Sequence, residues 1–288
     1  MKIAVITDSN SGISMNEARE LGIYVVPMPF LIDGKEYFEG ITLTQEKFYE
    51  RLEAGSEVST SQPSPESVMN TWDDALATHD AVIYIPMSSG LSSSCQTALM
   101  LAEEDYGGRV FVVNNQRISV TQRQSALDAL AMIKKGYSAA DIKRILEEDR
   151  LNSSIYITVG TLEYLKKGGR ITPAVYAIGS LLRIKPILSI QGEKLDAFAT
   201  CRTISHGKET MIAAIRKDAE TRFGGLDKDN VYLAVACSAN LEDGEAFAQE
   251  LREAFPGFDV YMAPLSLSIG CHIGPKSLAV TVTKKLKV

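Results

Sequence analysis

The first half of this chain contains four short, almost wholly apolar runs, each ending close to a proline or to polar residues. They lie at residues 2–6, 23–26, 81–86 and 109–113. Continuous apolar runs of this length, without alternation, are typical of strands buried on both faces of a parallel sheet. Helical patterns separate them, and parallel neighbours need such crossovers. The first half therefore predicts an α/β fold with a mostly parallel sheet.

A small insertion interrupts this pattern near residues 28–57. Within it, residues 30–38 predict a hairpin, because Asp33 and Gly34 suit the type I′ turn that joins antiparallel strands tightly. A helix follows the hairpin. Residues 58–64 after that helix are predicted to be a polar loop.

The second half mixes hairpins with helices instead of repeating strand and helix. The expected elements are a strand at 155–159, an apolar helix from about Thr172, a hairpin around Gln191, a long helix from about His206, and strands at 232–236, 259–262 and 277–282. Consecutive hairpins favour a mixed α/β (α+β) layer over a second doubly wound sheet. We therefore divide the chain into an N-terminal domain, residues 1–155, and a C-terminal domain, residues 156–288.

Composition narrows the class of protein. The net charge of −6 argues against broad nucleic-acid binding, which needs a basic face. The nearest two of the four cysteines, Cys237 and Cys271, are 34 positions apart, so a metal site is not expected and a reducing cytoplasm is. The first apolar run is too short for a signal peptide, and no run reaches the roughly 18 residues of a membrane span. We expect a cytoplasmic protein without cofactor, nucleic-acid partner or stable membrane insertion.

Several motifs that mark common enzyme classes are missing. Neither the P-loop pattern GxxxxGK[ST] nor the dinucleotide-binding pattern GxGxxG occurs, so the usual phosphate-binding loops are not predicted. The nucleophile elbow GxSxG and the zinc-protease pattern HExxH are absent too. These absences weaken the expectation of an enzyme.

Three polar loops are rich in small hydroxyl residues, at 7–9, 60–64 and 88–94. The first and third follow predicted parallel strands, whose carboxyl ends share one edge of the sheet and form the usual ligand site. The third also leads into a helix, whose first N–H groups can bind an anion. The loops predict an anion site of hydroxyl and backbone donors, without an arginine clamp. The candidate ligand contacts are Asp8, Ser9, Thr60, Ser61, Ser92 and Ser93.

Simpler explanations exist for several of these residues. Serines before helices commonly serve as N-caps, and an aspartate directly after a first strand is often a turn residue. The basic segment 166–170 suits the C-terminal end of a helix, where cations interact favourably with the dipole. His272 lies between Gly270 and Gly274, which predicts an irregular turn with close backbone approach, whereas a lone histidine is often a surface or core filler.

Six short motifs occur along the chain in a familiar order. They are TDS at 7–9, TSQPS at 60–64, SSGLS at 88–92, GGRI at 168–171, KPIL at 185–188 and HIGP at 272–275. With these motifs the chain resembles the DegV family of bacterial fatty-acid-binding proteins over essentially its full length.

This resemblance implies an N-terminal Rossmann-like domain and a C-terminal α/β domain, with a long-chain fatty acid buried between them. It implies that Thr60 and Ser92 hold the carboxylate near His272, and that Arg170 and Arg202 lie on the open face, where a partner docks. Some members deliver the fatty acid to a separate ATP-dependent fatty acid kinase, which makes an acyl phosphate for phospholipid metabolism. The chain is therefore expected to be an acyl carrier with no catalysis of its own.

Two departures from the family pattern concern the same loops. Ser93, Ser94 and Cys95 stand where the family usually has Gly, Thr and Tyr, and Lys276 stands at a glycine position. Both leave the proposed head-group residues intact. They affect the detailed fit of the ligand and the local shape of the docking surface.

Two enzymatic alternatives stay open at this point. Ser92, His272 and Asp8 can be arranged as a lipase-like triad, although the nucleophile elbow is missing. A dihydroxyacetone-kinase-like domain is the second alternative, because those kinases share a related fold, although no nucleotide loop supports it.

Overall fold

The structure is a computed structural model that describes residues 1–170, 172, 175, 184–193 and 195–287. The strands are β1 Ile3–Asp8, β2 Ile23–Val26, β3 Pro29–Ile32, β4 Lys35–Phe38, β5 Val58–Thr60, β6 Ala81–Ile85, β7 Val110–Val112, β8 Ser153–Thr158, β9 Lys185–Ile190, β10 Leu195–Cys201, β11 Val231–Cys237, β12 Val260–Pro264 and β13 Leu278–Lys284. The helices are α1 Met15–Leu21, α2 Gln45–Glu53, α3 Pro65–Leu76, α4 Ser94–Asp105, α5 Val120–Lys134, α6 Ala139–Glu148, α7 Glu163–Lys167, α9 Ile204–Arg222, α10 Leu241–Ala254 and α11 Leu267–Ile273, with the 3-10 helices η1 Ser9–Ser11 and η2 Asp149–Leu151.

The first sheet contains the parallel strands that the sequence predicts. Its order is β2-β1-β6-β7, and each neighbouring pair is parallel. The chain leaves β1 on one side for β2 and returns on the other side for β6, so that Thr7 lies opposite Ile85. Between β1 and β6 the order of the strands reverses. The loops after these two strands diverge there and leave room for a ligand.

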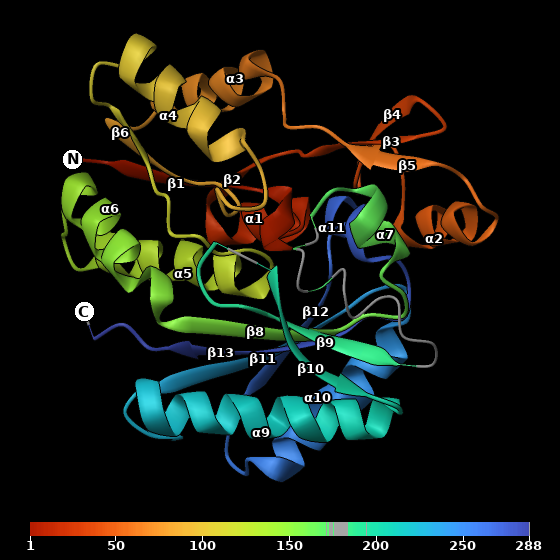
Figure 1. The fold of residues 1–288 in the computed structure, drawn as a ribbon. Coiled ribbons are helices and arrows are strands. Elements are labelled where there is room, and N and C mark those ends of the chain that lie inside the picture. The colour runs from red at the N-terminus through yellow and green to blue at the C-terminus, as the bar shows by residue number, and fades with distance from the viewer. Residues whose placement is uncertain (171, 173–174, 176–183, 194, 288) are drawn as a thin grey trace.

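Helices cover both faces of this sheet (Figure 1). On one face α3 and α4 enclose a core around Trp72 and Tyr84, whose ring centroids are 5.4 Å apart. On the other face α1, α5 and α6 contribute a second core, in which Met132 and Ile142 are fully buried. The prediction of a Rossmann-like α/β fold for the first half is therefore confirmed.

The second sheet is mixed, in the order β10-β9-β8-β13-β11-β12. Its described pairs are antiparallel except for β11 with β12. One face packs on α9 and α10, and the other turns toward the first sheet, with α5 in contact with strands of both (Figure 1). The expected α/β second half is confirmed. The helix predicted from about Thr172 falls mostly outside the described residues, and the domain boundary near residue 155 stays a prediction, two residues past the start of β8 at Ser153.

The insertion forms a small antiparallel sheet of its own, in the order β4-β3-β5, beside α2. Asp33 and Gly34 have φ angles of 51° and 77°, as a type I′ turn requires. The expectation of a polar loop at residues 58–64 is wrong at its start, because Val58–Thr60 forms β5. A three-residue segment with two hydroxyl residues has no strand pattern of its own. Pairing with β3 supplies the hydrogen bonds that make it a strand.

The segment around His272 also differs from the expected irregular turn. Residues Leu267–Ile273 form α11, with the hydroxyl of Ser266 as its N-cap. Gly270 argues against a helix when the sequence is considered alone, because glycine is a poor helix former. It is required by packing, because a Cβ there would lie 2.9 Å from the hydroxyl of Tyr49.

A buried ion pair fixes the loop after β7 to the start of the second sheet. The Nη2 atom of Arg117 lies 2.6 Å from Oδ2 of Asp149, and the side chains are only 2% and 6% exposed. Arg117 also donates to the carbonyl oxygen of Asp149 and to the hydroxyl of Ser125. Its own carbonyl oxygen accepts from the N–H of Ser88 in the loop after β6. The pair therefore holds two loops of the first sheet in place.

Replacing Asp149 by Asn is expected to lower the free energy of unfolding by about 3–5 kcal/mol, because the Arg117 charge stays buried without its counter-charge. Urea denaturation followed by circular dichroism measures this change. Glu148→Gln is the matched control, since that carboxylate pairs with Arg144 at a position 65% exposed, and it should change stability by less than about 0.5 kcal/mol. Equal effects of the two substitutions would contradict the role given to the buried pair.

Candidate functional site

The carboxylate of Asp8 joins the loops that follow β1 and β6. Its Oδ2 atom accepts a hydrogen bond from the N–H of Met87 at 2.6 Å. Its Oδ1 atom accepts from the N–H of Asn10 and from Nε2 of Gln122, both at 3.0 Å. Asp8 is fully buried, and burial raises its pKa to about 6 although these donors favour the ionised form. Asp8 therefore links the two loops from within.

A cavity lies between these loops, the second sheet and α11. Its empty space is about 920 Å³, which includes the part open to solvent at its mouth. Most of its wall is apolar and comes from the second sheet, α7 and α11, including Ile155, Ile157, Ile190 and Ile273. Such a wall suits a hydrocarbon better than a polar metabolite.

Hydroxyl groups from separate segments line the cavity. Thr60 lies at the end of β5, Ser61 follows it, and Ser92 lies in the loop after β6. His272 extends from the last turn of α11, and its Nε2 atom is 2.8 Å from Oγ1 of Thr60. All four line the cavity, and Arg170 does so as well. The structure thus brings together five of the side chains that the sequence singled out.

Two glycines allow α7 and α11 to approach closely enough to fix His272. A Cβ on Gly168 would lie 2.1 Å from Nδ1 of His272. A Cβ on Gly274 would lie 2.3 Å from the ring of Tyr164, and Gly274 also has a φ of 69°. Each glycine is therefore needed where a helix end passes against a ring. These are the glycines of the GGRI and HIGP motifs.

The imidazole of His272 is held neutral. Burial, together with the nearby positive charge of Arg170, lowers its pKa from 6.5 to about 4. Its Nδ1 atom has no hydrogen-bond partner among the described residues. If the single proton is on Nε2, the ring donates to Oγ1 of Thr60. The hydroxyl hydrogen of Thr60 is then available to an acceptor in the cavity.

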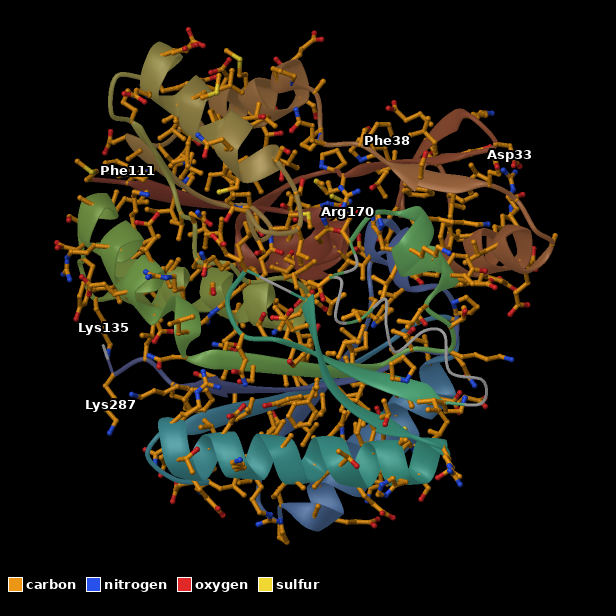
Figure 2. All side chains as sticks on the ribbon, viewed as in Figure 1. Asp33, Phe38, Phe111, Lys135, Arg170 and Lys287 are labelled. Carbon is orange, nitrogen blue, oxygen red and sulfur yellow. The ribbon has the colours of Figure 1, made fainter. Side chains whose placement is uncertain are left out.

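The two arginines that the sequence singled out occupy different places. Arg170 lies between α7 and the loop after β6 (Figure 2), where Nη1 donates to the carbonyl oxygen of Gly168 at 2.6 Å and Nε donates to that of Leu91 at 3.3 Å. Arg202 is exposed directly after β10 and does not line the cavity. Arg170 is therefore a cation at the mouth, while Arg202 lies outside it.

Three of the candidate ligand contacts do not line the cavity. The carboxylate of Asp8 is occupied by the hydrogen bonds that join the two loops. Ser9 accepts a hydrogen bond from the N–H of Met28 at 3.0 Å. Ser93 is exposed at the start of α4. These three residues shape the loops and do not face the hollow.

The lipase-like triad is not assembled. The hydrogen bonds that Asp8 accepts come from Met87, Asn10 and Gln122, not from His272. The Nε2 atom of His272 faces Thr60 instead of Ser92. A nucleophile and its base must lie within hydrogen-bond reach of each other, and the base must be oriented by the acid. The structure has neither the contact between Ser92 and His272 nor the one between His272 and Asp8.

The departures from the family pattern have structural consequences. Lys276 adopts a φ of 63°, in the left-handed region that favours glycine. Cys95 is fully buried in the first turn of α4, and burial raises the pKa of its thiol to about 12. Neither residue lines the cavity. The departures therefore change the loops around the site, not its wall.

Sequence reasoning missed the far wall of the cavity, which is the face of the second sheet turned toward the first. On that face Ile157 pairs with Ala279, and further from α7 and α11 Ile155 pairs with Thr281. Ala236 lies beside Ala279 on β11. Ala236 and Ala279 are small and leave space on this face, whereas the other face of the sheet carries Val and Leu residues that pack on α9 and α10. The alternation of large and small residues along β11 is the signal that could have revealed this wall.

In the part of the chain that the structure describes, no group of three or more His, Cys, Asp and Glu side chains is placed to hold a metal ion. Within those same residues, no helix combines the length and apolarity needed to cross a bilayer.

Comparisons with known proteins agree with the motifs. The profile of the family described as "Uncharacterised protein, DegV family" matches residues 2–285. A DegV domain-containing protein of Deinococcus radiodurans is 34% identical over 198 residues, which are 68% of this chain and 70% of that protein. One from Staphylococcus aureus is 27% identical over 284 residues, 99% of each chain.

Solved structures show the same fold. A fatty-acid-binding DegV family protein from Thermus thermophilus superposes with a TM-score of 0.89 at 28% identity, covering 99% of this chain and all of the other. The fatty acid binding protein DegV of Bacillus subtilis gives 0.86 at 28% identity, with the same coverage. With a family match from end to end and this shared fold, the chain belongs to the DegV family.

Proposed function

We propose that this chain binds one long-chain fatty acid in the cavity and presents the carboxylate at the mouth. The observation that carries the proposal is the cavity itself, an apolar hollow that ends at the hydroxyls of Thr60 and Ser92 beside a neutral His272. The Thermus and Bacillus relatives, which are described as fatty-acid-binding, support it.

The tail supplies most of the affinity in this proposal. Burying a methylene contributes about 0.8 kcal/mol, so about 14 of them contribute ~11 kcal/mol before ordering costs are subtracted. Each hydrogen bond to the charged head adds about 1.5–3 kcal/mol. The head group therefore sets the orientation of the ligand more than its retention.

We assign the head group to Thr60, Ser61 and Ser92, with His272 as the residue that orients Thr60. With its proton on Nε2, His272 donates to Oγ1 of Thr60, which directs the hydroxyl hydrogen of Thr60 to the carboxylate. Hydroxyl donors leave more negative charge on the carboxylate than a bidentate arginine would. The carboxylate consequently stays reactive toward a further step. Asp8, Ser9 and Ser93 act through the shape of the loops.

That further step, in our proposal, belongs to a separate ATP-dependent fatty acid kinase in the cytoplasm. A carboxylate oxygen attacks the γ-phosphorus of ATP, the bond to the β-phosphate oxygen breaks, and an acyl phosphate and ADP result. Arg170 at the mouth matches phosphate geometry, and we assign Arg202 to docking of the kinase on the family resemblance. The chain itself performs no catalysis.

Thr60→Val and Ser92→Ala should each weaken fatty-acid binding by about 1–3 kcal/mol, because each removes one donor from an anion. The affinity for palmitate is measured by displacement of a fluorescent fatty acid. Ser93→Ala is the matched control, since Ser93 neighbours Ser92 but does not line the cavity, and it should bind as the parent does. Parent-like affinity in both test variants would refute the head-group assignment.

The imidazole of His272 should remain neutral from pH 8 down to about pH 5 in the folded protein. Because its pKa is lower in the folded chain than in the unfolded chain, the stabilising contribution is present above about pH 6.5 and is lost as the pH falls toward 4. A carbon-13 NMR titration of the three histidines, with His272→Gln to assign the signal, measures this. A midpoint of His272 near 6.5 would show that the ring is accessible to solvent instead of buried.

Arg170→Ala and Arg202→Ala should leave the amount of bound fatty acid unchanged but lower acyl-phosphate formation by a fatty acid kinase of the same organism at least ten-fold, about 1.4 kcal/mol. Arg144→Ala on α6, at a position 57% exposed, is the control and should support full turnover. Fatty acid lost during purification, or unchanged turnover, would return the two arginines to structural roles.

A further inference from the structure

We propose that Thr281 determines the longest acyl chain that the cavity accepts, because its side chain separates the cavity from a second hollow. The inference rests on the proposed binding of a fatty acid. It concerns the end of the cavity opposite to Thr60 and His272, where the methyl end of the ligand would lie.

The register of the second sheet places Thr281 at that far end. Thr158, the last residue of β8, pairs with Leu278, and the chain then continues into α7 near the mouth. Moving away from the mouth along β13, Ala279 and then Thr281 line the cavity. On β8, the residue that pairs with Thr281 is Ile155. An acyl chain that enters at Thr60 therefore meets Ala279 before it meets Thr281.

A second hollow begins where the cavity ends. It lies between the start of α5 and strands β11 to β13, and measures about 1170 Å³ including its open part. Thr281 is the residue common to the walls of both spaces among the described residues. At the N-terminal end of α5, Ser119 lines the cavity, whereas the next residue, Val120, lines the second hollow.

The side chain of Thr281 contributes to the walls of both spaces. Thr281 is 3% exposed. Its neighbour across to β11 is Ala234, which is small. The methyl end of a bound chain would stop against Thr281. Removal of its methyl and hydroxyl groups would let the chain continue toward the second hollow.

The test offers each purified, delipidated variant an equimolar mixture of saturated fatty acids with 14, 16, 18 and 20 carbons and measures the bound species by mass spectrometry. Thr281→Ala should raise the ratio of the 20-carbon to the 16-carbon acid at least about four-fold, the effect of burying one further methylene. Ala279→Val, which narrows the cavity nearer the mouth, should shift the distribution toward 14 carbons. Thr281→Val preserves the size of the side chain and should keep the parent distribution.

Thr283→Ala is the matched control. Thr283 lies two residues further along the same face of β13 and lines the second hollow but not the cavity, so its loss should leave the distribution unchanged. If Thr281→Ala and Ala279→Val both bind the parent distribution, the role of Thr281 is refuted while fatty-acid binding stands. If the parent protein takes up none of the four acids, the proposed function itself fails.

Discussion

An apolar cavity inside a folded chain is unfavourable to maintain, because its walls lose van der Waals contacts and tend to collapse inward. In this protein the wall that faces the cavity belongs to a sheet whose other face is packed on α9 and α10 by residues such as Val280 and Val282. That packing holds β11 and β13 in place. The same strands carry Ala236 and Ala279 on the cavity side, so one sheet both seals a core and leaves a space open.

The opposite wall combines apolar packing, by residues such as Met87, Leu91 and Ile118, with buried polar groups. Hydrogen bonds hold the loops after β1, β6 and β7: Asp8 accepts from Met87, and the carbonyl oxygen of Arg117 accepts from Ser88. Each of these loops is anchored by a charged group that is itself partnered, as Arg117 is by Asp149. Buried charges of this kind are unfavourable when one partner is removed. The arrangement therefore favours a single loop conformation, with Ser92 fixed at the mouth.

At the head-group end of the cavity the buried side chain is neutral, in contrast to the buried charges that anchor the loops. His272 is kept neutral by burial, and the nearby cation, Arg170, is turned toward carbonyl oxygens of Gly168 and Leu91. A charged histidine or a bidentate arginine would bind a carboxylate more strongly, but either would withdraw charge from the oxygen that attacks phosphorus in the kinase reaction we propose. Neutral donors such as Thr60 suit the fatty acid that we propose, which is held by its tail and reacts at its carboxylate.

The sequence is informative wherever a residue's role is local and uninformative where a distant neighbour sets that role. The parallel strands and the loops that end them follow from apolar runs, so the residue pattern and the family motifs together are enough to name Thr60 and Ser92 as candidates. Strand β5 and helix α11 could not be predicted, because β5 exists through its pairing with β3 and Gly270 is explained by the distant side chains of Phe48 and Tyr49. Thr281 illustrates the same limit. Its strand is predictable from its apolar pattern, but which face of that strand meets a cavity depends on how the two sheets are placed against each other, and that placement is fixed by α5 and the buried loops between them.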